Sequence, residues 1–225
     1  LAEHLGVAPA EPLLRGLGLA SLVQCRFAEA RRRGEELLAR ADQGSRVAAT
    51  EGHYLLGVTA FWEGSFATAR ARLQAAIGCF DPADRATHLS LFAQDPEVVC
   101  GCRLAYAKWY LGLADDAEAL MAAVLRDARA RGHPASVGYA CCYAAMLAVE
   151  LGDDRFAAGA LAEGRPLWVG QLAFFVPMAQ LLEGWLDLRA GRNSGLTRLE
   201  QGVDGYRDPS RHLHLTWALA MAARA

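Results

Sequence analysis

Cysteine is the residue type in this sequence most able to do redox or metal chemistry. The chain has six cysteines: Cys25, Cys79, Cys100, Cys102, Cys141 and Cys142. On a helix, Cys100 and Cys102 point about 200° apart, and neighbours such as Cys141 and Cys142 point about 100° apart. Neither pair can readily close on one metal ion, which needs ligands at Cys-x-x-Cys or similar spacing. We interpret all six as small buried residues. Redox sensing and an adventitious metal site are the alternatives.

Histidines, serines and paired carboxylates also fail to form a recognisable catalytic pattern. No His-Glu-x-x-His motif and no Gly-x-Ser-x-Gly elbow occurs. The pairs Asp115-Asp116 and Asp153-Asp154 resemble catalytic dyads, but each follows a turn glycine at an expected helix start. Negative charge is favoured there by the helix dipole, so we interpret both pairs as capping residues. The histidines are interpreted as solvated or hydrogen-bonded polar residues, with ligation as the alternative: His4, His53, His88, His133, His212 and His214.

The basic residues do not indicate phosphate or nucleic-acid chemistry. Lys108 is the only lysine, and it does not end a glycine-rich phosphate-binding loop. The run from Arg31 to Arg33 is expected on a solvated outer helix face, the alternative being a phosphate or nucleic-acid contact. A net charge of −2 gives no general attraction to nucleic acid or anionic lipid. We therefore predict no enzymatic activity, no cofactor, no metal and no direct nucleic-acid partner.

The overall composition is that of a packed soluble protein. Hydrophobic residues make up 53% of the 225 residues and charged residues 21%, so the chain can bury a substantial core. No uninterrupted apolar run approaches the roughly 18 residues of a membrane span, and 172–182 is expected to be a buried helix. The N-terminus has no signal-peptide character, which predicts a cytoplasmic location. Because the first residue is leucine, we expect the sequence to be a fragment of a longer protein.

Small residues recur along the chain and indicate a repeat. One small residue, which we call the anchor, starts each copy of the pattern. The anchors are 39 to 48 residues apart, at Gly18, Gly57, Ala105, Ala145 and Gly184. Seven residues after the last four anchors stand the turn glycines Gly64, Gly112, Gly152 and Gly191. Twelve residues after the middle three anchors stand Ala69, Ala117 and Ala157. Glycine suits the left-handed end of one helix, polar residues then start the next, and small residues let the two backbones approach. Each unit is therefore expected to be a helical hairpin that neighbouring hairpins must cover.

This pattern predicts an all-α solenoid of about five helix pairs plus a terminal helix, as a single domain over residues 1–225. The units are expected at 8–45, 46–80, 95–132, 135–169 and 171–207. First helices are expected near 11–24, 47–62, 95–111, 136–150 and 172–190. Second helices are expected near 27–41, 66–79, 115–131, 154–168 and 194–206, and the terminal helix at 210–224. A turn-rich segment, 81–94, is inserted after the second unit. Leu196 and Glu200 break the pattern, so we expect the fifth hairpin to be looser.

The small-residue pattern resembles the tetratricopeptide repeat (TPR). Leu56-Gly57, Leu104-Ala105 and Ala144-Ala145 match the large–small step on the first helix of that repeat, and Ala69, Ala117 and Ala157 match its second helix. The stretches 94–112 and 131–140 look similar to the C-terminal repeat region of large bacterial signalling proteins. Those proteins carry an AAA/STAND-type ATPase with a class III nucleotide cyclase, a kinase or a DNA-binding regulator. The resemblance implies a right-handed solenoid with a regulatory or scaffold role.

In TPR solenoids the first helices line a concave groove, and the resemblance assigns mostly apolar and aromatic residues to it here. The candidates are Tyr54, Phe61, Trp62, Tyr106, Trp109, Tyr110, Met146, Leu181 and Trp185. An open strip of this kind predicts binding of a protein or peptide helix, including a second copy of the chain. The alternative function is sensing of a small apolar effector that regulates an attached domain. The alternative structural interpretation is that these side chains are ordinary core.

Overall fold

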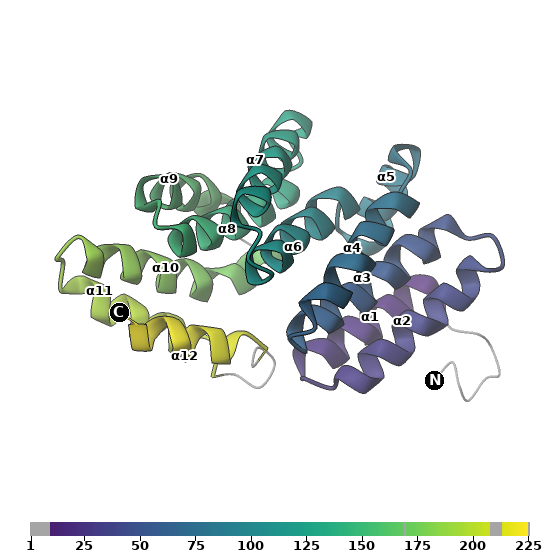
Figure 1. Ribbon diagram of the computed structural model, residues 1–225, viewed down its shortest axis with the longest axis horizontal. Coiled ribbons are helices and arrows are strands. Elements are labelled where there is room, and N and C mark those ends of the chain that lie inside the picture. Colours follow the sequence, from purple (N-terminus) through teal and green to yellow (C-terminus); the bar gives the residue numbers. More distant parts are fainter. Residues whose placement is uncertain (1–9, 169, 208–212, 225) are drawn as a thin grey trace. The chain divides into compact units, whose positions relative to one another are not determined.

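A computed structural model describes residues 10–168, 170–207 and 213–224 (Figure 1). Within these residues the protein is all-α: they form twelve α-helices and short 3-10 turns, with no strand. This confirms the predicted fold class. The chain divides into two compact units, Leu1–Gly112 and Leu113–Ala225, which we describe separately. His4, His212 and the first residues expected for the terminal helix lie outside the described residues.

Unit 1 contains six α-helices that follow the predicted hairpins and add one unexpected helix. They are α1 (Glu11–Val23), α2 (Phe27–Ala41), α3 (Arg46–Trp62), α4 (Phe66–Cys79), α5 (Arg85–Phe92) and α6 (Pro96–Tyr110), with a 3-10 turn at Pro82–Asp84. Consecutive helices pack on one another from α1 to α4, and α4 then packs on α6. The first helices α1, α3 and α6 also contact their neighbours in that order, so they form one continuous face. We call it the α1–α3–α6 face.

Unit 2 contains the other six α-helices. They are α7 (Ala114–Arg131), α8 (Pro134–Leu151), α9 (Asp154–Gly164), α10 (Val176–Arg189), α11 (Ser194–Asp204) and α12 (Leu215–Arg224). Helix α9 ends four residues earlier than expected and α10 begins four residues later, because 3-10 turns form at Arg165–Leu167 and Gly170–Phe175. Pro166 lacks the N–H that a continuing helix would need. The arrangement within each unit, helix packed on next helix, is consistent with a helical solenoid.

The turn glycines predicted from the repeat adopt the expected conformation. Gly64, Gly112, Gly152 and Gly191 have φ between 73° and 83°, the left-handed region in which a side chain is disfavoured. In the first hairpin the same position is occupied by Cys25, which has φ 58°. The repeat therefore imposes its turn geometry even where the sequence carries no glycine.

The anchor residues let the paired helices approach closely. A Cβ added to Gly57 would lie 2.8 Å from the Leu73 side chain, so α3 and α4 meet across a position that only glycine fits. At Gly184 an added Cβ would lie 2.8 Å from both the Gly195 carbonyl oxygen and the Leu199 nitrogen. Ala145 and Ala157 are fully buried in the hairpin of α8 and α9. The small residues of the predicted pattern therefore lie where the two helices of a hairpin come into close contact.

The expectation that the fifth hairpin is looser is wrong. Helices α10 and α11 pack as extensively as α3 and α4. The second helix is shifted by one residue relative to the anchor, so Gly195, Leu199 and Gly202 take the buried positions and Leu196 points to solvent. In this shifted register, α11 again turns small and apolar residues toward α10.

Helix α8 is the most buried element of unit 2. Of the described helices it is the one long and apolar enough to cross a membrane, but 72% of that stretch is buried inside the structure. Such burial is typical of the core helix of a soluble protein. Its apolar character is therefore explained by packing against α7, α9 and α10.

Candidate functional site

The predicted groove residues divide sharply by burial. Six of the nine are buried: Tyr54, Phe61, Tyr106, Met146, Leu181 and Trp185. Trp62 and Trp109 are partly exposed and Tyr110 is 43% exposed. For the buried six, the structure favours the core interpretation over an open strip. The three that remain accessible all lie at the C-terminal ends of α3 and α6.

These ends carry a cluster of interlocking rings, which we call the aromatic cluster: Phe61, Trp62, Phe66, Tyr106 and Tyr110. Phe66 and Tyr110 are stacked, with ring centroids 4.4 Å apart. Phe61 packs edge-to-face on Trp62 at 5.5 Å, on Phe66 at 5.5 Å and on Tyr110 at 5.9 Å. Phe61 is therefore the centre of a packed cluster, and the outer members Trp62 and Tyr110 reach solvent.

A cation borders the aromatic cluster. The Arg103 guanidinium lies 5.6 Å from the Trp62 ring centroid and 6.0 Å from that of Phe61. Aromatic faces attract guanidinium groups at these distances. Tryptophan, tyrosine and arginine are also the residue types that dominate binding energy at protein interfaces.

At the other end of the α1–α3–α6 face lies a buried ionic network that joins three helices. The Arg15 Nε donates to Glu51 Oε2 at 3.0 Å, and His88 Nδ1 lies 2.7 Å from Glu51 Oε1. The three residues are 4%, 2% and 1% exposed. Arg15 also donates to the Gln94 side chain. Burying charges such as those of Arg15 and Glu51 is costly unless they are paired and hydrogen-bonded, which they are here.

The repeat register places Arg15 in this network. Arg15 stands three residues before the anchor Gly18, as Tyr54 stands three residues before Gly57. The two side chains meet: the Arg15 guanidinium lies 4.8 Å from the Tyr54 ring centroid. Two equivalent positions, three residues before the anchors Gly18 and Gly57, are therefore in contact, and both side chains are buried.

The inserted segment lies against Arg15, whose side chain donates to Gln94. It was expected to be turn-like, and it forms the extra helix α5, which contacts α1. Asp81 and Asp95 stand at its two ends. Their side chains accept hydrogen bonds from the backbone N–H groups of Ala83 and Glu97, respectively, as helix-capping residues do. His88 extends from α5 to Glu51, between the rings of Phe80 and Phe92 at centroid distances of 5.4 and 5.7 Å.

Further ion pairs hold the ends of the inserted segment. Arg85 donates to Asp95 at 2.6 Å and to Glu97 at 2.8 Å. These two carboxylates raise the pKa of the Arg85 guanidinium against the opposing effect of burial, so the group is cationic at any physiological pH. Arg46 of α3 pairs with Asp81 at 2.8 Å. Helix α5 is thus fastened to unit 1 at both ends and through His88 in the middle.

The cysteines near these sites are not suited to nucleophilic chemistry. Burial, reinforced by the Glu51 carboxylate, raises the pKa of the Cys100 thiol well above its ordinary value. Burial likewise raises the pKa of Cys141 to about 12, with the Glu163 carboxylate adding to the effect. Across the described residues, no group of three His, Cys, Asp or Glu side chains is placed to hold a metal ion. The thiols of Cys100 and Cys141 are therefore not activated for nucleophilic attack.

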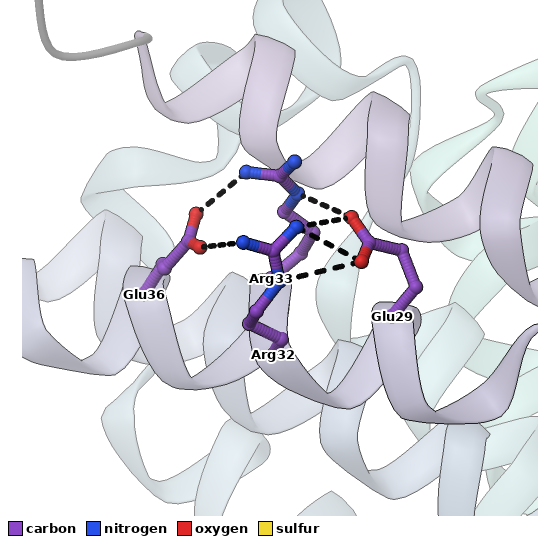
Figure 2. Close-up of polar contacts among 4 residues, drawn as sticks. All are labelled: Glu29, Arg32, Arg33 and Glu36. Carbon is purple, nitrogen blue, oxygen red and sulfur yellow. Dashed lines mark hydrogen bonds and ion pairs between the residues drawn. The ribbon is translucent and has the colours of Figure 1, made fainter. Parts of the chain in front are cut away.

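The acidic pairs and the arginine run have structural roles in the described residues. Asp153 caps α9 by accepting the Phe156 N–H at 2.9 Å, while Asp115 and Asp116 lie in the first turn of α7. In α2, Arg32 and Arg33 each bridge Glu29 and Glu36 (Figure 2). This lattice of i,i+3 and i,i+4 pairs accounts for Arg32 and Arg33, and Arg31 pairs with Glu63, so all three arginines have carboxylate partners.

The buried network was missed by sequence reasoning. His88 was interpreted as one scattered polar residue, and Glu51 was not singled out. Two signals were available: Arg15 stands three residues before the anchor Gly18, as Tyr54 does before Gly57, and Glu51 interrupts the otherwise apolar spacing of its helix. Neither signal identifies His88, because its contact with Glu51 spans 37 positions and depends on how α5 is placed.

Comparison with known proteins adds no assignment to this geometry. No protein-family model matches the sequence, and no curated protein is significantly similar to it.

Proposed function

We propose that this chain is a non-catalytic interaction module that holds helices against the α1–α3–α6 face. One helix, α5, is supplied by the chain itself. A second segment, from a partner protein or another copy, binds at the accessible aromatic cluster. In the setting implied by the TPR-like resemblance, the module belongs to a larger cytoplasmic signalling protein of bacteria and relays the state of its partner to an attached domain.

The observation that carries the proposal is the docking of α5. Helices of eight residues are not stable alone in water, because nucleation costs more than so few hydrogen bonds return. The order of α5 therefore comes from the surface that receives it. That surface contributes Glu51 and Arg15 to the network with His88 and Gln94.

The aromatic cluster supports the second part of the proposal. Its central ring, Phe61, is buried and packed against the other rings, whereas Trp62 and Tyr110 remain accessible. A preorganised aromatic surface loses little conformational entropy when a partner binds. Tyr110 and Trp62 are the residues to change in a binding test. Tyr106 is unsuitable because it is fully buried, and its truncation would damage the core.

A complementation experiment tests whether the face accepts a helix. Residues 85–92 are replaced in the full chain by a Gly/Ser segment of equal length, and a fluorescein-labelled peptide of residues 81–95 is added. We expect saturable binding measured by anisotropy, and recovery of thermal stability. A peptide with His88→Ala and Phe92→Ala serves as the matched control and should bind at least tenfold more weakly.

A different outcome would contradict the proposal. If the replaced chain keeps its helical circular dichroism and does not bind the native peptide at millimolar concentration, the face is not a helix-binding surface.

A further inference from the structure

Unit 2 contains an apolar cavity that neither the repeat pattern nor the proposed function requires. It has a volume of about 80 Å³ and lies between α7, α8 and α9. Its floor is formed by α8, and its walls by α7 and the start of α9. The lining residues are Glu118, Met121, Ala122, Ala144, Leu147, Ala148, Leu151, Asp153 and Phe156.

The cavity reaches the surface. Met121, Ala144 and Leu147 at the bottom are buried, whereas Ala122 at the mouth is exposed and Phe156 is 42% exposed. An exposed phenylalanine beside a preformed apolar hollow is unusual for a surface that serves only solubility. It is typical of the anchor pockets found at the centres of protein interfaces.

The volume limits what the cavity can hold. An apolar cavity of about 150 Å³ accommodates benzene, so a cavity of 80 Å³ cannot fully enclose an aromatic ring. It suits the branched end of one aliphatic side chain, such as leucine. Small alanine side chains at 144 and 148 create this space on the α8 floor.

The rim of the cavity has a single sign of charge. Two of the nine lining residues, Glu118 and Asp153, are carboxylic acids, and none is cationic. Asp115 and Asp116 add negative charge in the first turn of α7, the helix that carries Glu118. An approaching segment with arginine or lysine next to its apolar anchor would gain from this field.

We infer that this cavity is a docking site for a basic segment of a partner protein that inserts one leucine-sized side chain. We call it the anchor pocket. The partner segment places a cationic residue over Glu118 and Asp153 on either side of the anchor. The inference concerns unit 2 only, so it stands or fails independently of the α1–α3–α6 face.

The methionines of the chain provide a direct readout. The sequence has four, Met121, Met146, Met178 and Met221, and only Met121 lines the anchor pocket. With ¹³C-methyl methionine the full chain gives one methyl resonance per residue, so three of them act as internal controls. The probe is a twelve-residue peptide of alanine, glutamine and arginine with one central leucine, and arginines three and four residues from it.

We expect titration of this peptide to shift the Met121 resonance with a dissociation constant in the millimolar range or below, leaving the other three unchanged. Replacing the leucine by alanine should weaken binding by about 10- to 100-fold, since one buried aliphatic side chain is lost. Replacing it by tryptophan should also weaken binding, because the ring exceeds the cavity. Glutamate in place of the arginines should abolish the shift, and raising the salt concentration should reduce it.

Protein variants separate pocket binding from general association. Ala144→Leu fills the cavity from its floor. Ala122→Leu blocks its mouth from an exposed position, so it leaves the core intact if the first variant folds poorly. Both should abolish the Met121 shift. Glu118→Gln removes a rim charge without changing shape and should weaken the arginine peptide but not an uncharged leucine peptide.

The inference is overturned if Met121 does not respond at millimolar peptide, or if Ala122→Leu binds as well as the native chain. A Met121 shift that is indifferent to peptide charge and to Glu118→Gln would overturn the assignment of a basic partner.

Discussion

His88 Nδ1 and Glu51 Oε1 lie 2.7 Å apart, and both side chains are excluded from solvent. This contact joins the inserted helix α5 to α3. Because Glu51 also accepts a hydrogen bond from Arg15 of α1, one carboxylate unites three elements of unit 1. The inserted segment, including helix α5, is thereby part of the packed unit.

Removing the shared carboxylate should destabilise unit 1 strongly. Glu51→Ala leaves the Arg15 charge buried without its partner, which costs about 3–5 kcal/mol in comparable cases. The measurement is the free energy of unfolding from urea denaturation. Glu63→Ala is the matched control, because Glu63 pairs with Arg31 at the surface and its loss should cost about 1 kcal/mol or less. Equal effects of the two substitutions would show that the buried network is not a stabilising element.

Two glycine substitutions test the close approach of α10 and α11. Gly184→Ala places a methyl group 2.8 Å from backbone atoms of α11 and should destabilise the protein by about 1–3 kcal/mol. Gly159→Ala lies in α9 with open space around it and should stabilise by about 0.5–1 kcal/mol, because alanine favours the helix. Thermal denaturation of both variants checks the prediction, and the same sign for both would contradict the close helix contact.

The first hairpin turn can be improved by the residue that the other turns use. Cys25 has φ 58°, a conformation that costs a non-glycine residue about 1 kcal/mol or more. Cys25→Gly should therefore raise the free energy of unfolding, while Gly64→Ala at the equivalent turn should lower it by about 1 kcal/mol. A loss of stability in Cys25→Gly would mean that the turn is not strained.

The cysteines should react in order of exposure. The interpretation of all six cysteines as buried is wrong for two of them: Cys25 is exposed and Cys79 is partly exposed, whereas the other four are buried. Burial raises the pKa of Cys100 and Cys141, which keeps both as unreactive thiols at neutral pH. With an aromatic disulfide reagent at pH 7.5 we expect one fast thiol, one slower thiol and four that react only on unfolding. Fast reaction of a buried cysteine would indicate an activated nucleophile and would contradict a non-catalytic role.

His53 should make the protein acid-sensitive near neutral pH. Burial, and then the Arg72 charge, lower the pKa of His53 below its ordinary value of 6.5, and the Arg72 Nη1 lies 3.4 Å from its Nδ1. The unfolded chain therefore binds this proton more readily than the folded protein, so stability falls as the pH drops below about 6.5. His53→Gln should lessen the fall in thermal midpoint between pH 7.5 and 5.5. An unchanged pH dependence would exclude His53 as its source.

Local features were the predictable part of this fold. The left-handed turns at Gly64, Gly112, Gly152 and Gly191 follow from backbone sterics within a few residues, and each was identified from spacing alone. The one-residue shift that buries Gly195 could not be identified in this way, because it depends on how α11 packs against α10. The burial of Tyr106 or Trp185 likewise depends on neighbouring helices. The Glu51–His88 contact depends on the docking of α5, which no local pattern encodes.

Hydrogen exchange of α5 tests the central claim most directly, namely that the α1–α3–α6 face holds this helix through His88. The measurement compares amide exchange of residues 85–92 in the native chain, in His88→Ala and in Leu91→Ala, a control at an exposed position of the same helix. We predict that His88→Ala accelerates exchange in α5 by about 10- to 100-fold, since a hydrogen bond to a charged group is lost. Exchange in α3 and α4 should change far less, and Leu91→Ala should leave α5 protected. Equal protection of α5 in both variants would contradict the claim.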